Sequence, residues 1–151
     1  MPNRLQAETM ITREADYAIR AVLYLASQDD GQLVATSELA ERMLVPYRFL
    51  RRIVQKLVDG GLLEAQRGKG GGVRLTRTSR EISLLDVLQT VDPRALCLNG
   101  CLEDTSICRR AVFCVVRRNL DQLQERLAAD LRALTFDRLQ AEDAAAPPAS
   151  R

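Results

Sequence analysis

Residues 36–76 read TSELAERMLVPYRFLRRIVQKLVDGGLLEAQRGKGGGVRLT. This stretch predicts two short helices joined by a tight turn. Thr36 or Ser37 is expected to cap the first helix, which then runs to about Met43. Pro46 suits the first position of the second helix, because its φ is already fixed there and its missing N–H costs nothing. Two such helices in succession indicate a helix-turn-helix unit.

The second of these helices is amphipathic and should end at Gly60 and Gly61. At 100° per residue its apolar residues share one face. These are Leu50, Ile53, Val54 and Leu57. The opposite face carries Arg48, Arg51, Arg52 and Gln55. Such side chains bond base edges and phosphates in a major groove, so this face is predicted to read DNA; the alternative is a surface helix with incidental charge.

Two strand-like runs flank the segment RGKGGG at residues 67–72. Glycines allow a sharp turn and close backbone approach, and Arg67 and Lys69 can reach phosphates or a narrow minor groove. A nucleotide-binding P-loop is excluded, because its Gly-Lys-Ser/Thr spacing is absent and no helix pattern starts directly after the glycines. The segment therefore predicts a β-hairpin wing.

The charge is distributed unevenly along the 151 residues. The whole chain has a net charge of only +2, yet nine basic and two acidic residues lie between Pro46 and Arg80. That segment carries +7 and the remainder −5. A basic block in an acidic chain favours a polyanionic partner, because contacts to phosphate release counterions; the alternative is a solvated charged surface.

Composition excludes several other classes of function. The chain has no His, which rules out Ser-His-Asp and Cys-His catalysis and any His-ligated metal. With no constellation of polar groups beyond its thiols, it is not expected to be an enzyme. No apolar run is long enough for a membrane span, and residues 1–9 lack a signal-peptide pattern, so we expect a cytoplasmic protein of one domain.

Helical periodicity continues on both sides of residues 36–76. An amphipathic helix is expected from about Thr12 to Ala26. Ser83 with Asp86 forms a capping-box pattern that starts another short helix. A long helix should follow from about residue 109 or 114 to residue 139. Its apolar residues are spaced almost as a heptad seam, at Val116, Leu120, Leu123, Leu127, Leu131 and Leu134. This seam favours a symmetric dimer, and the alternative is that the helix packs back on its own domain.

All four cysteines lie within 18 residues, at Cys97, Cys101, Cys108 and Cys114. In a cytosolic protein, clustered thiols are more often metal ligands or redox groups than disulfides. Four-thiolate zinc sites usually contain close Cys pairs, which are absent here, whereas the spacing in iron–sulfur sites varies more. Spacing alone therefore ranks an iron–sulfur cluster above zinc, with thiol redox switching third.

Three segments together resemble the Rrf-type winged-helix transcriptional regulators. They are TREADYAIR at residues 12–20, the wing at residues 67–72, and the run from Cys101 to Cys114 that leads into the long helix. The resemblance covers about residues 10–139. The family includes the iron–sulfur biogenesis regulator and the nitric oxide-sensing repressor of bacteria. It implies a homodimer on a palindromic or pseudo-palindromic promoter site in double-stranded DNA, with the recognition helix in the major groove and the wing in the minor groove.

The resemblance also implies a [2Fe–2S] or [4Fe–4S] cluster held by Cys101, Cys108 and Cys114. Some relatives add a His three residues after the last Cys, but this chain has Arg117 there. Others use an acidic residue of the first helix from the opposite subunit, which corresponds to Asp16. Asp16 is favoured as the further ligand, and Cys97 is its rival. Arg51 and Arg52 stand where some relatives carry Glu and Gln, so the DNA sequence preference is not transferable.

The sequence thus predicts a mainly α protein in five parts. They are a flexible tail (1–9), a winged helix-turn-helix domain (10–93), a cysteine-rich cluster-binding loop (94–114), a long C-terminal dimerisation helix (115–140) and a disordered tail (141–151). The expected function is a transcriptional regulator whose DNA affinity depends on the cluster. The alternatives are a cluster-free regulator that senses through thiols or a metabolite, and a small iron–sulfur carrier.

Overall fold

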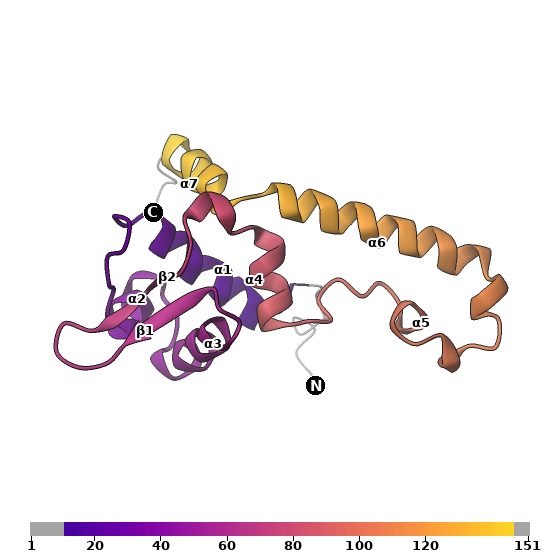
Figure 1. Ribbon diagram of the computed structural model, residues 1–151, viewed down its shortest axis with the longest axis horizontal. Coiled ribbons are helices and arrows are strands. Elements are labelled where there is room, and N and C mark those ends of the chain that lie inside the picture. The colour runs from indigo at the N-terminus through magenta and orange to yellow at the C-terminus, as the bar shows by residue number, and fades with distance from the viewer. Residues whose placement is uncertain (1–10, 147–151) are drawn as a thin grey trace, which may run out of the picture.

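The structure is a computed structural model and describes residues 11–146. It is mainly helical with one small antiparallel hairpin, which confirms the predicted winged-helix fold. Figure 1 shows the domain at one end, with α6 extending away from it toward the segment around α5. The elements are α1 (Arg13–Ala26), α2 (Thr36–Arg42), α3 (Tyr47–Asp59), β1 (Leu63–Gln66), β2 (Gly72–Leu75), the 3₁₀ turn η1 (Ser79–Glu81), α4 (Leu84–Val91), α5 (Gly100–Glu103), the 3₁₀ turns η2 (Thr105–Ile107) and η3 (Ala111–Phe113), α6 (Val115–Ala133) and α7 (Phe136–Ala145).

Two of the expected helix starts differ from the structure. Helix α2 has Ala35 at its N-cap with no side-chain cap, so the predicted Thr36 or Ser37 cap is wrong. The reason is that Val34 pairs with Val73 in a β-bridge, which keeps the chain extended up to Ala35. Pro46 is the N-cap of α3 rather than its first residue. The expected capping box of Ser83 and Asp86 at α4 is confirmed.

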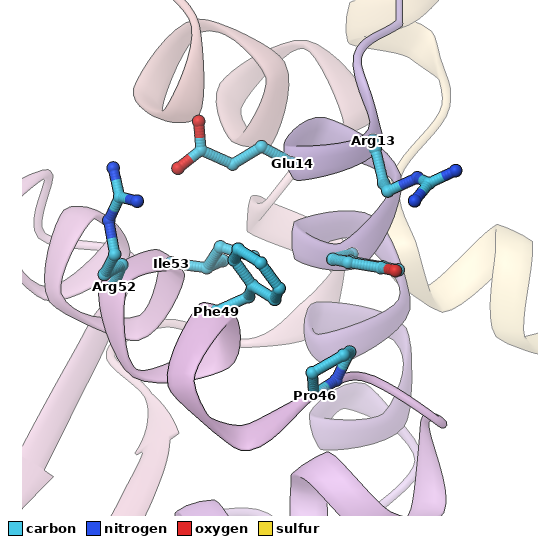
Figure 2. A pocket seen from close by; sticks show the side chains of 7 residues that line it. Arg13, Glu14, Pro46, Phe49, Arg52 and Ile53 are labelled. Atoms are coloured by element: carbon cyan, nitrogen blue, oxygen red, sulfur yellow. The ribbon is translucent and has the colours of Figure 1, made fainter. Parts of the chain in front are cut away.

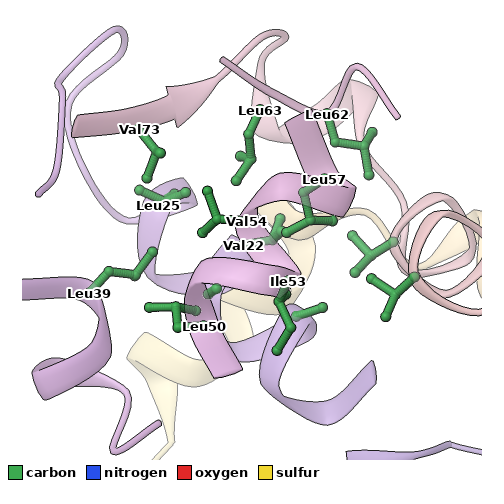
Figure 3. Close-up of a cluster of buried hydrophobic side chains, with 14 of the residues drawn as sticks. Val22, Leu25, Leu39, Leu50, Ile53, Val54, Leu57, Leu62, Leu63 and Val73 are labelled. Atoms are coloured by element: carbon green, nitrogen blue, oxygen red, sulfur yellow. The ribbon is translucent and has the colours of Figure 1, made fainter. Parts of the chain in front are cut away.

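The apolar face of α3 lies in the main core, as predicted. Leu50, Ile53, Val54 and Leu57 are all at most 8% exposed. Figure 3 shows them packed with Val22 and Leu25 of α1, Leu39 of α2 and residues at the base of the hairpin. Since this face is anchored, the opposite face of α3 is fixed toward solvent.

The expected single helix over residues 115–140 is two helices, α6 and α7, separated at Leu134 and Thr135. The break has a tertiary cause. Leu84 N–H donates to Leu134 O at 2.8 Å, and Phe136 N–H donates to Ile82 O at 3.0 Å. These bonds turn the chain so that the fully buried Phe136 enters the main core. The DNA-binding domain, which was predicted to end at residue 93, therefore also includes the start of α7.

Helix α7 continues to Ala145, so the expected tail over residues 141–151 is wrong for its first part. The rest of that tail, from residue 147 on, and the expected tail over residues 1–9 lie outside the described residues.

The seam of α6 is buried at only one end. Leu131 is 8% exposed and packs with Leu85, Leu88 and Leu96 in a second, smaller core. Toward the other end, Leu123 is 50% exposed and Val116 is 65% exposed. Within residues 11–146, no helix combines the length and the apolar composition that a membrane crossing needs.

Candidate nucleic-acid interface and cysteine segment

The solvent face of α3 carries the predicted DNA-reading side chains. Arg48, Arg51, Arg52 and Gln55 are all exposed, as their position opposite the buried face requires. They line a groove of about 710 Å³ that also includes Arg67 of the hairpin. The fold therefore brings five of the six predicted DNA-contacting residues to one concave surface.

Most of the arginine side chains that line this groove have no hydrogen-bond or ion-pair partner in the part of the chain that the structure describes. Within residues 11–146, Arg51, Arg52 and Arg67 make no hydrogen bond or ion pair through their side chains. Arg48 stacks over Phe49, with its guanidinium carbon 4.7 Å from the ring centroid. Gln55 donates to the Asp59 carboxylate at 2.7 Å and would exchange that bond for one to a base. Free guanidinium groups in a groove are suited to bind phosphates and guanine edges.

The wing is held at its base and turns sharply at its tip. Glu64 and Arg74 are cross-strand partners and form an ion pair. A Cβ on Gly72 would lie 2.3 Å from Val34 O, so this close approach requires glycine. Gly68 and Gly70 have φ values of 100° and 77°, in the left-handed region that glycine tolerates. They flank the exposed Lys69, which stands at the tip outside the lining of the groove.

The four cysteines lie in residues 94–114, where a cluster-binding loop was expected and where the structure has the short turns α5, η2 and η3. Figure 1 shows the segment around α5 at the far end of the molecule from the hairpin. All four thiols are free and partly exposed. Among residues 11–146, however, no three Cys, Asp or Glu side chains are gathered into a metal-binding group. The donor chemistry fits an iron–sulfur cluster, since thiolates are its usual ligands, although the thiols are not assembled into a ligand set.

The environment of Cys97 disfavours its thiolate form. Burial raises the pKa of the Cys97 thiol, and the neighbouring Glu103 carboxylate raises it further. The thiol is within hydrogen-bond distance of Asn99 O, at 3.3 Å. Because the thiolate is the form that binds metal, a raised pKa makes Cys97 the poorer ligand candidate.

Arg117 has a contact that sequence reasoning missed. Its Nε donates to Cys101 O at 2.9 Å, and its backbone N–H donates to Cys114 Sγ at 3.4 Å. One residue of α6 thus contacts two of the three expected cluster ligands. A further contact joins Leu98 N–H to the Gln124 side chain at 3.0 Å, which ties the same segment to α6. A long polar side chain on the inner face of α6 is the only sequence signal for these contacts.

Asp16 is placed on α1, where its carboxylate pairs with Arg20 at 2.8 Å. Both side chains are about half exposed. Such an exposed pair adds little stability, so the carboxylate is free to exchange its partner. Its expected role as a ligand to a cluster in the opposite subunit stays a prediction.

Comparisons with known proteins place this geometry in a class. The model of the Rrf2 family, described as iron-dependent transcriptional regulator, matches residues 11–142. The chain belongs to the Rrf2 family, whose members are transcriptional regulators rather than enzymes and bind DNA, typically as dimers.

Three solved structures show the same fold. IscR of T. potens is 20% identical, with a TM-score of 0.68 over 95% of this chain and 92% of its own. CymR of B. subtilis, described as the global cysteine regulator, is 19% identical, with a TM-score of 0.71 over 87% of this chain and 96% of its own. The oxidized form of Staphylococcus aureus CymR is 18% identical, with a TM-score of 0.66 over 86% of this chain and 94% of its own.

Removing the Arg117 side chain should loosen the cysteine segment. In metal-free protein, Arg117→Ala is expected to speed chymotrypsin cleavage between residues 97 and 114 about threefold or more, because one hydrogen bond that holds Cys101 is lost. Cleavage sites are read by mass spectrometry. Arg118→Ala, which removes an exposed neighbour, is the matched control. Equal cleavage rates in the two variants would show that the Arg117 contact does not hold the segment.

Proposed function

We propose that this protein is a sequence-specific DNA-binding regulator that acts as a homodimer on a palindromic promoter site. Helix α3 would enter the major groove and the wing the adjacent minor groove. The observation that carries the proposal is the groove in which unpaired arginines of α3 meet Arg67 of the wing. Because promoter DNA is its partner, we place the protein in the cytoplasm.

The exposed apolar side chains support dimerisation. Val112 and Phe113 are 80% and 85% exposed, and Val116 and Leu123 of the α6 seam are exposed as well. A run of large apolar side chains left in water favours burial against a partner. Isologous pairing of two α6 helices would fix the distance between two α3 helices, as a palindromic site requires.

We also propose that an iron–sulfur cluster, either [2Fe–2S] or [4Fe–4S], is held by Cys101, Cys108 and Cys114, with Asp16 of the opposite subunit as further ligand. When bound, the cluster supplies chemistry that responds to redox state, nitric oxide or iron and sulfur status. The support lies in three free, partly exposed thiols on a segment of short turns and in the contacts of Arg117 to the Cys101 carbonyl and the Cys114 thiol.

The position of the cysteine segment explains how its state could change DNA affinity. The segment follows α4 of the DNA-binding domain and leads directly into α6. Arg117 and Gln124 attach it to α6, so a rearrangement of the thiols would pull on that helix. A change in the spacing of two α3 helices needs to alter binding by only a few kcal/mol to switch occupancy.

A second candidate is a regulator that senses through bare thiols. It is favoured by the observation that no three ligands are gathered within the described residues. Anaerobic purification separates the two candidates, because the cluster form should be coloured and contain comparable iron and sulfide. A colourless protein with reactive thiols, or one rich in zinc, would refute the cluster proposal.

The third alternative, a small iron–sulfur carrier, is tested by duplex binding against salt. A protein that neutralises several phosphates with Lys and Arg loses affinity steeply as salt rises. We expect a slope of log K against log salt that corresponds to several contacts per protomer. Absence of binding to any duplex in a selection from random sequence would refute DNA regulation and favour the carrier.

The two parts of the interface should contribute differently. Arg52→Ala should weaken binding to the selected site by about 1–3 kcal/mol and should weaken binding to random DNA much less. The reason is that contacts to base edges give sequence specificity. Lys69→Ala should weaken both duplexes alike, because the exposed tip contacts phosphates. Both are measured by fluorescence anisotropy at fixed salt. Equal selectivity losses in the two variants would mean that α3 does not read the bases.

A further inference from the structure

A second cavity lies beside the DNA-reading helix. It has a volume of about 330 Å³ and lies between the start of α1 and the first two turns of α3. This volume is within the range of small-molecule sites in proteins. Its lining residues are Arg13, Glu14, Tyr17, Pro46, Phe49, Arg52 and Ile53.

Four of the seven residues that line this cavity are aromatic or apolar. Ile53 is almost fully buried, whereas Phe49 remains 39% exposed. Figure 2 shows the side chains of Phe49 and Ile53 close together at the centre of the view, with Pro46 below them. An exposed aromatic ring over a buried apolar floor favours a ligand with a flat apolar body.

The charge around this cavity favours an anion. The carboxylate of Glu14 already pairs with Lys56 Nζ at 2.9 Å. Arg52 has no such partner among residues 11–146. In Figure 2 the Arg52 guanidinium rises beside the cavity, while Arg13 is turned away from its centre. Arg52 is therefore the cation that a ligand over Phe49 would meet, and a guanidinium can bind a planar carboxylate through two parallel hydrogen bonds.

Arg52 belongs to two surfaces at once. It lines this cavity and also the groove between α3 and the wing. An Arg52 guanidinium that points into the cavity to form a bidentate pair with a ligand carboxylate is turned away from DNA in the groove. A ligand held by Arg52 would therefore compete with DNA without entering the groove.

We propose that the cavity between α1 and α3 binds a small organic carboxylate with an aromatic or apolar body, and that this ligand lowers DNA affinity by drawing Arg52 away from the DNA. The part that concerns DNA rests on the proposed function. The ligand would act directly on the recognition helix α3, whereas the thiols lie near the end of α6 that is distant from the DNA-binding domain.

The test uses 1-naphthoate, with 1-naphthamide as its uncharged counterpart. Binding to the full-length protein without DNA is measured by equilibrium dialysis. We expect one saturable site per protomer and a preference for naphthoate of about tenfold, the effect of one charge-assisted pair. Absence of saturable binding, or equal affinity for both compounds, would overturn the proposal.

Two variants on α3 locate the charge. Arg52→Gln should reduce the preference for naphthoate to about twofold or less, because the carboxylate loses its partner. Arg51→Gln removes the same charge from the same helix but lies only in the groove, and should leave the preference intact. Equal loss in the two variants would indicate general electrostatic attraction and refute the site.

Coupling to DNA is measured separately. A saturating concentration of duplex should weaken the binding of naphthoate about fivefold or more. Naphthoate should weaken the binding of the duplex by the same factor. Unchanged naphthoate affinity on a duplex that binds well would refute the competition through Arg52. A protein that binds no duplex but keeps the Arg52-dependent preference would refute the proposed function and leave the ligand site standing.

Discussion

Phe136→Ala should lower the free energy of unfolding by about 3–5 kcal/mol, the usual cost of deleting a fully buried phenyl ring. Phe136 has no exposed surface and is among the largest fully buried side chains described. It packs in the main core with residues of α1 and α4, and its N–H donates to Ile82 O. The variant therefore leaves a cavity in the main core and removes the anchor at the start of α7.

Urea denaturation followed by circular dichroism, at one protein concentration, measures this loss. Phe136→Leu should recover most of the stability, because it keeps an apolar side chain in the site. Glu142→Ala, at an exposed position of the same helix, is the control and should change the free energy of unfolding little. A loss below about 1 kcal/mol for Phe136→Ala would show that α7 is not part of the folded core.

Cys101→Ser, Cys108→Ser and Cys114→Ser should each reduce the iron and sulfide bound after anaerobic purification to about a tenth of wild type or less. The reason is chemical: the thiolate binds iron, and a serine hydroxyl stays protonated at neutral pH. Cys97→Ser should keep the full content, in line with the raised pKa of that thiol. Iron and acid-labile sulfide are measured against protein, together with the visible absorption spectrum.

The same assay separates the two candidates for the further ligand. Asp16→Ala should speed the loss of iron to a chelator, whereas Cys97→Ser should not. The Asp16–Arg20 pair is exposed, so its removal is expected to leave the fold intact. Retention of iron in Cys101→Ser, or its loss in Cys97→Ser, would refute the proposed ligand set.

Much of the DNA-binding domain could be predicted from local pattern. The separation of Leu50 and Ile53 from Arg51 and Arg52 on α3 follows from helix geometry alone. The wing follows from glycines between two short apolar runs, and the start of α4 follows from the Ser83 capping box. In each case the residues that decide the structure are neighbours in sequence.

The features that escaped prediction depend on residues far apart in the chain. The break between α6 and α7 is set by hydrogen bonds to Ile82 and Leu84, about 50 residues earlier. The extended Ala35 is set by the pairing of Val34 with Val73. The cavity beside Arg52 exists only once α1 packs beside α3, and the groove on its other side exists only once the hairpin lies beside α3. The periodicity of apolar residues within one helix or strand does not indicate such long-range contacts.

The one-sided anchoring of α6 makes it a lever arm with its fulcrum near Leu131. The rise from Leu131 to Val115 at 1.5 Å per residue gives an arm of about 24 Å, so a rotation of roughly 5° moves the far tip by about 2 Å. Under the proposed function, chemistry at the thiols would reach the DNA-binding domain as a tilt of α6. Reactive small molecules would never have to penetrate the part of the protein that grips the promoter.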